Sequence, residues 1–106
     1  YAIVDLPKDH PIFRSQYVLT DGVPQIASIN HWASTGGDTS ERGADSAQVH
    51  ARGIADASGR IMVFMTHNTD VSDSWEREAE DPRYFYQFSV PGYAVGANVV
   101  LYAMTH

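Results

Sequence analysis

The stretch GRIMVFMTHNTDVSDSWERE, residues 59–78, decides how the rest of the chain is interpreted. A turn at Ser58 and Gly59 leads into the apolar residues 61–65, and the polar residues 66–70 follow them directly. This pattern predicts a buried strand that carries a polar tip and then continues into a helix. In open α/β sheets, ligands bind at the carboxyl ends of such strands. We therefore expect a functional site, if there is one, to include this tip.

Two further segments predict strands around this central one. Residues 48–55 alternate in polarity, which places His50 and Arg52 on one face of a strand. The turn residues 56–59 join that strand to the central strand at 60–65, so the two should form an antiparallel hairpin. Residues 1–6 predict another short strand, and together these segments indicate the small sheet of an α/β domain.

Helices are expected mainly after the central strand. Ser72 or Asp73 can cap a helix that runs to about residue 81, with Trp75 on its inner face. Pro82, which follows an aspartate, predicts the first position of a second helix through residue 88, although its aromatic residues would also suit a strand. Pro91 predicts the start of a last helix that ends near residue 105 and presents an apolar stripe.

The N-terminal half is less regular. His10 precedes Pro11, so it should be extended or in a turn, followed by at most one helical turn. Residues 24–32 fit either a strand or a loop. Residues 34–46 are polar and rich in glycine, and we interpret them as a long surface loop. Its backbone N–H groups and Arg42 could cradle an anion, but its own acidic residues favour a self-bonded or partner-ordered loop.

Composition excludes several classes of protein. The chain has 106 residues, of which 43% are hydrophobic, so we expect a single globular domain over residues 1–106. The net charge of −6 argues against nucleic acid as a partner. Without cysteine there is no catalytic thiol, disulfide or cysteine metal site. No apolar run is long enough for a transmembrane helix. Because Tyr1 begins inside a predicted strand, we expect a processed or partial chain.

The chain resembles the C-terminal half of a bacterial family of domains of unknown function, number 4159. The resemblance covers essentially the whole chain and rests on five blocks in order: LPxDHPIF (6–13), GGxTSERG (36–43), GRxMVxMTHN (59–68), WERE (75–78) and GYAxGxNVxLYAxTH (92–106). It implies a partial flavodoxin-like or amidotransferase-like α/β sheet of mixed strands, with the C-terminal helix packed on it. It also implies the cell envelope, on the periplasmic side, although a cytoplasmic location stays open. The resemblance transfers no activity.

Chemically capable residues gather at the strand tip, but none forms a recognised motif. The histidines lack metal-ligand spacing, so a metal site would need His67 to meet His10, His50 or an aspartate across the sheet. There is no nucleophile elbow, and adjacent strand residues such as Thr66 and His67 point to opposite faces. We therefore assign no catalytic residue, no metal and no cofactor.

The candidate ligand or partner site comprises eight residues: Thr66, His67, Asn68, Asp70, His10, Trp32, Arg42 and Trp75. The two tryptophans could stack on a sugar or contact a protein, and core packing is the alternative for Trp32. We favour a non-catalytic interaction or scaffold module over an enzyme. It would be a bacterial envelope protein or a peripheral subunit of a membrane-associated complex that reaches the membrane through a protein partner. The alternative is a hydrolase-like or carbohydrate- or ligand-binding domain with its site at residues 66–70.

Overall fold

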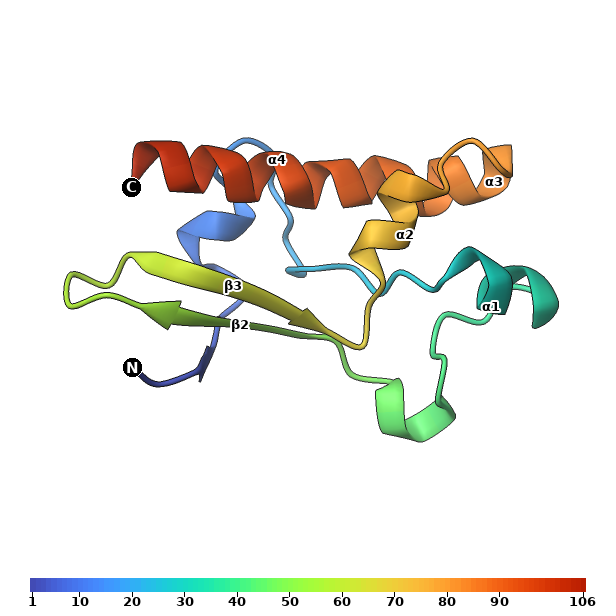
Figure 1. Cartoon of the computed structure of the whole chain (residues 1–106), viewed down its shortest axis with the longest axis horizontal. Helices are drawn as coiled ribbons and strands as arrows, with labels where there is room; N and C mark the ends of the chain where they lie inside the picture. The colour runs from blue at the N-terminus through green and yellow to red at the C-terminus, as the bar shows by residue number, and fades with distance from the viewer. The chain divides into compact units, whose positions relative to one another are not determined.

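The computed structural model describes all 106 residues and has an α/β fold with a three-stranded sheet and several helices (Figure 1). The chain divides into two compact units. The sheet unit comprises Tyr1–Val23, His50–His67 and Ala94–His106, and the loop unit comprises Pro24–Val49 and Asn68–Tyr93.

The sheet contains β1 (Val4–Asp5), β2 (His50–Ala55) and β3 (Ile61–His67), in the order β1-β2-β3. The predicted hairpin of β2 and β3 is confirmed (Figure 1). Its register places His50 opposite His67. Both strand pairs are antiparallel, so the expectation of mixed strands is wrong. The antiparallel order follows from the tight turn at residues 56–59, which cannot connect parallel strands.

The structure also corrects the role of β3. It is an edge strand rather than the centre of the sheet, because β1 pairs with β2 and not with β3. It is not buried either: Met62 and Val63 keep 45% and 43% of their surface exposed. The rule that places ligands at the carboxyl ends of parallel strands therefore does not apply to this tip.

The C-terminal part of α4 (Val90–Thr105) packs in the sheet unit, as expected of the last helix. The Tyr102 hydroxyl is buried against the start of β3 and accepts a hydrogen bond from the Ile61 N–H at 3.0 Å. The Arg60 guanidinium donates to the carbonyl of Ala103 at 3.0 Å, which satisfies an acceptor in the last turn. Asn98 is also buried in this unit, and its side chain binds the backbone of residues 16 and 17.

The first helical turn is the one predicted at Pro11. The segment η1 (Pro11–Phe13) is a 3-10 turn, and His10 caps it by accepting the Ile12 N–H at Nδ1. Ile12 and Phe13 are buried, and the Phe13 ring meets Phe64 of β3 edge-on. The turn therefore anchors the N-terminal segment to the inner face of the sheet.

The loop unit is built around aromatic side chains. It contains α1 (Ile29–Ser34) and η2 (Gly43–Ser46), then α2 (Val71–Glu76), α3 (Pro82–Tyr84) and the π-helical η3 (Phe85–Ser89). Trp32 of α1 meets the rings of Tyr84 and Phe88 edge-on, with centroids 5.6 and 6.1 Å away. The buried Tyr84 hydroxyl donates a hydrogen bond to the Ala27 carbonyl at 2.8 Å. A side chain of the aromatic core therefore provides the hydrogen bond that this loop carbonyl needs.

The predicted last helix is confirmed as α4, whose start lies one residue before Pro91, but no break separates it from the helical residues before it. The elements α3, η3 and α4 follow one another without a break from residue 82 to residue 105. The Val90 N–H bonds to the Phe85 carbonyl, five residues earlier, which is the π-helical pattern. A proline inside an α-helix lacks an N–H and its ring collides with the carbonyl four residues before it. The wider π turn just before Pro91 gives this ring room, so the helix continues.

Two other helix boundaries differ from expectation. The helix α2 is capped by Asp70, whose carboxylate accepts the Asp73 N–H, and it ends at Glu76 instead of residue 81. Trp75 is 40% exposed, so it does not form the predicted inner stripe. Residues 24–32, expected to be strand or loop, instead end in α1, because Ser28 caps a helix there through the His31 N–H.

Candidate functional site

The polar tip of β3 divides between the two units. Thr66 and His67 end β3 in the sheet unit, whereas Asn68 and Asp70 belong to the loop unit. Asn68 adopts a left-handed backbone, with φ of 63°, and its side chain donates to the Gln48 carbonyl at 2.7 Å. Asp70 is used as the cap of α2. The amide and the carboxylate therefore stabilise the turn of the chain and the helix that follows.

The sheet unit brings a different set of polar side chains together. His50 lies directly opposite His67, and their ring centroids are 5.9 Å apart. Arg52 follows on the same face of β2, and its Nη1 lies 3.4 Å from Nδ1 of His67. Asp5 of β1 accepts a hydrogen bond from Nε of Arg52 at 2.8 Å. We call these four residues the polar row of the sheet; it crosses all three strands.

The contact with Arg52 determines which nitrogen of His67 carries the proton. A guanidinium has only N–H donors, so Nδ1 of His67 must be the acceptor. In the neutral ring the proton then lies on Nε2, which has no hydrogen-bond partner within the protein. The Asp5 carboxylate orients Arg52 from the other side. The polar row therefore presents free N–H donors at the end of β3.

Of the histidine contacts that a metal site would need, one is present. His67 does meet His50, but His10 is used as the cap of η1. No group of three or more histidine, aspartate or glutamate side chains has an arrangement that could hold a metal ion. A metal bound through Nε2 of His67 would also have to displace the proton that the Arg52 contact places there. The donors of the polar row are thus better matched to a ligand with hydrogen-bond acceptors.

The outer edge of β3 carries free backbone groups. The Leu6 N–H bonds to the Ala51 carbonyl at 2.8 Å, so the backbone of Ala51 points to β1. The direction of the backbone N–H and C=O groups alternates along a strand. Those of His50 and Arg52 therefore point to β3, where the two residues lie opposite His67 and Met65.

The intervening residues of β3, Phe64 and Thr66, therefore direct their N–H and C=O groups away from β2. No strand pairs with β3 on that side, and only Ile61, at its start, is capped there, by Tyr102. The seven residues of β3 include no charged lysine, arginine, aspartate or glutamate and no proline, which are the usual protections of an edge strand. The edge is thus chemically open to pairing with another strand.

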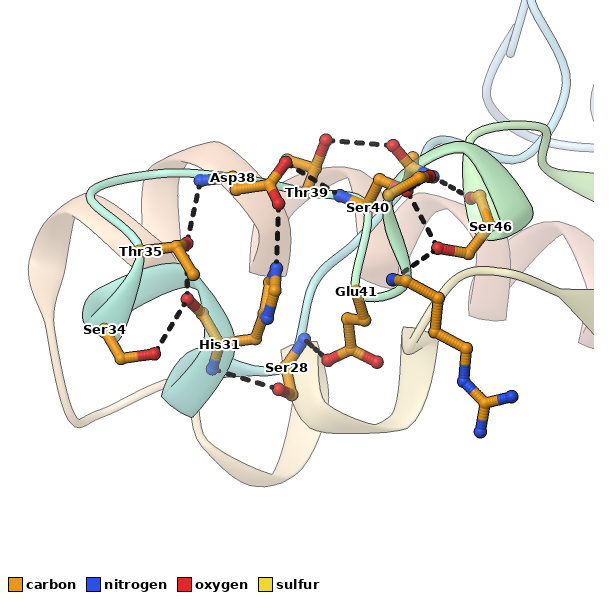
Figure 2. A network of polar contacts seen from close by, with 12 residues as sticks. Ser28, His31, Ser34, Thr35, Asp38, Thr39, Ser40, Glu41 and Ser46 are labelled. Carbon is orange, nitrogen blue, oxygen red and sulfur yellow. Dashed lines mark hydrogen bonds and ion pairs between the residues drawn. The ribbon is translucent and has the colours of Figure 1, made fainter.

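The loop unit contains the long polar loop, and its polar groups bond to one another (Figure 2). His31 binds the Asp38 carboxylate at 3.0 Å, and the Glu41 carboxylate accepts the Ser28 N–H at 3.1 Å. The hydroxyls of Ser40 and Ser46 lie 2.8 Å apart. Both residues are on the right side of Figure 2. These contacts correspond to the self-bonded loop that the sequence favours over an anion cradle.

These hydrogen bonds also lower the pKa values of two acidic side chains in the loop. The hydrogen bond to His31 is the main reason that the pKa of Asp38 lies below its ordinary value. The pKa of Glu41 is likewise lowered, chiefly by its hydrogen bond to Ser28. Both carboxylates are thus held in the charged form, which opposes the binding of an anion in this loop.

The remaining predicted residues lie in the loop unit. Trp32 is 8% exposed and packs in the aromatic core, which is the alternative that the sequence left open. The guanidinium of Arg83 lies over the Trp32 ring, 5.5 Å from its centroid. The side chain of Arg42 makes no hydrogen bond or ion pair; its backbone N–H donates to Ser46. Trp75 is partly exposed on α2.

The sequence missed His50, Arg52 and Asp5 as site residues, although part of the signal was present. Period-two alternation placed His50 and Arg52 on one face, and the hairpin turn set the register that brings His67 opposite His50. Asp5 could not be found in this way, because its pairing with Arg52 depends on a contact between distant segments.

Comparisons with known proteins identify a family but no function. A family model described as "Domain of unknown function (DUF4159)" matches residues 1–104. No curated protein matches the chain, and no solved structure does. None of its helices is both long and apolar enough to cross a membrane.

Proposed function

The chain belongs to the DUF4159 family of domains of unknown function, and from this premise we propose that it is a non-catalytic interaction module. Its partner is a protein segment in extended conformation, which binds as an additional strand at the outer edge of β3. The observation that carries the proposal is the unpaired and uncharged edge of β3, with free backbone groups at Phe64 and Thr66.

The exposure of the strand supports this function. Proteins that add a strand to a sheet edge gain affinity from main-chain hydrogen bonds, and specificity from side chains on alternate positions. The exposed side chains of Met62 and Val63 offer apolar contact area beside the open hydrogen-bonding groups. The edge at β1, in contrast, is only two residues long and offers little for a partner to pair with.

A proline at Thr66 tests the proposal with little disturbance of the sheet. The Thr66 N–H points away from β2, so Thr66→Pro removes a donor from the outer edge and leaves the β2–β3 bonds intact. The matched control is Thr66→Val, which keeps the N–H and the branched side chain. The probe is a capped seven-residue peptide of alternating threonine and valine.

We expect the peptide to shift the amide resonances of β3 in the wild type and in Thr66→Val. Thr66→Pro should weaken binding about tenfold, since it removes a main-chain hydrogen bond and fills the space that the added strand needs. Circular dichroism should show that both variants remain folded. Absence of peptide binding to the wild type, or binding that is equally strong in Thr66→Pro, would contradict the proposed function.

We also propose, on the family resemblance alone, that the module is a peripheral subunit of a membrane-associated complex on the envelope side of a bacterial cell. The same resemblance supports a relationship of its sheet to the amidotransferase-like α/β fold. Fractionation of cells that carry the tagged protein tests the location. Recovery from the cytoplasmic fraction alone would contradict it.

A further inference from the structure

We propose that the strand bound at β3 carries an acidic side chain beside His67, and that His50, Arg52 and His67 recognise its carboxylate. This inference rests on the proposed function and specifies the chemistry of the partner. It assigns a role to the polar row, which the main-chain pairing of β3 leaves unused.

The position of the polar row makes it accessible from the open edge. His67 is the last residue of β3 and is exposed, and its side chain shares the outer face of the sheet with His50 and Arg52. A residue placed opposite His67 on an added strand would have its Cβ about 5 Å away on the same face. A glutamate or aspartate at that position can reach Nε2 of His67.

The chemistry of the row matches a carboxylate. Nε2 of His67 carries a proton and lacks a partner, and the ring of His50 makes no hydrogen bond. Arg52 binds Asp5 through Nε and approaches His67 through Nη1, which leaves the N–H groups of Nη2 free. A carboxylate accepts hydrogen bonds at both oxygens and donates none, so it complements this set of donors.

The charge pattern points in the same direction. Neither β2 nor β3 contains an aspartate or a glutamate, although the whole chain has a net charge of −6. The nearest acidic group of the row is Asp5, and its carboxylate is bound to Arg52. The end of β3 is therefore a site rich in N–H donors, and the one carboxylate among its residues is already bound to Arg52, which favours an acidic residue of the partner.

Two capped peptides test the inference. Both alternate threonine and valine over seven residues, and one carries glutamate at its first position where the other carries glutamine. We expect the glutamate peptide to bind the wild type about fivefold tighter, the size of a well-placed exposed ion pair. His67→Phe should abolish this preference, and His67→Gln, which retains an N–H donor, should keep part of it. Lys8→Gln, which removes an exposed positive charge outside the polar row, should leave the preference unchanged.

The results of this test distinguish a failure of the carboxylate site from a failure of the proposed function. If the wild type binds both peptides equally, the carboxylate site is refuted and the open edge stands. A preference for glutamate that survives in both His67→Phe and Arg52→Gln would also refute the site. If neither peptide binds the wild type, the proposed function is itself refuted, and the inference fails with it. Histidine ring resonances that shift with the glutamate peptide and not with the glutamine peptide would support the site directly.

Discussion

The two units of the molecule differ in whether their polar groups have hydrogen-bond partners within the chain. In the loop unit the polar side chains of residues 28–46 bond to one another, and a buried tyrosine satisfies the Ala27 carbonyl. In the sheet unit, the backbone groups of Phe64 and Thr66 at the edge of β3 and Nε2 of His67 in the polar row have no partner within the chain. The most polar segment, residues 34–46, is therefore stabilised by its own hydrogen bonds, whereas a largely apolar strand carries the groups available to another molecule.

The largest effect should come from removing the centre of the loop unit. Trp32→Ala deletes a ring that packs against Tyr84 and Phe88, and we expect it to lower the free energy of unfolding by about 4 kcal/mol. Trp75→Ala is the matched control, because that ring is 40% exposed and should cost about 1 kcal/mol or less. Urea denaturation followed by circular dichroism measures both. Equal losses would mean that Trp32 is not the core residue of this unit.

A smaller effect is expected from crowding the contact between α2 and the start of α4. A Cβ added at Gly92 would lie 2.0 Å from Oγ of Ser74, so Gly92→Ala forces the two helices apart. We expect a loss of about 2 kcal/mol, typical of overpacking. Combining it with Ser74→Gly should cost less than the sum of the two single variants. Strict additivity in this double-mutant cycle would show that the two positions do not touch.

The next effect concerns the buried hydroxyl of Tyr84. Burial raises the pKa of this tyrosine above its ordinary value, and the neutral hydroxyl donates to Ala27. Tyr84→Phe leaves the carbonyl without its donor, and we expect a loss of about 1.5 kcal/mol. Tyr86→Phe should change nothing, since Tyr86 is 75% exposed. A thermal melt of both variants makes the comparison, and an unchanged melting temperature for Tyr84→Phe would refute the hydrogen bond's role.

The smallest effect is a pH dependence in the sheet unit. Burial, and then the nearby His106, lower the pKa of His10 below its ordinary value of 6.5. Folding therefore favours the neutral ring, whose Nδ1 accepts the Ile12 N–H. This contribution to stability is complete above pH 6.5 and is lost as the pH falls through the folded-state pKa.

His10→Asn keeps a cap that does not titrate, so it serves as the control for this pH dependence. The wild type should lose more stability than His10→Asn between neutral and acidic pH in matched urea melts. Parallel curves for the two proteins would show that His10 does not contribute.

Local signals in the sequence were enough to predict part of this structure. Alternation in residues 48–55 and the turn at 56–59 specify the hairpin, because both act over a few neighbouring residues. The short helical turn after His10 could also be predicted, since a proline at the first helical position fixes the start of the turn.

The predictions that differ from the structure concern features that depend on contacts between distant segments or on an unusual backbone conformation. The edge position of β3 depends on β1 pairing with β2, which lies far along the chain. The continuous helix through Pro91 depends on a π turn that no local propensity indicates. For the candidate site, the predicted residues include His67 but not its neighbour His50, and the free backbone groups of Phe64 and Thr66 follow only from the strand order.

Amide hydrogen exchange along β3 tests whether the outer edge of this strand is open. We expect alternation: Val63, Met65 and His67, which face β2, should exchange slowly, and Phe64 and Thr66 should exchange fast. Addition of the threonine–valine peptide should protect Phe64 and Thr66 and leave the other three unchanged. Slow exchange at Phe64 and Thr66 in the protein alone would contradict the claim, because their N–H groups would then already be bonded.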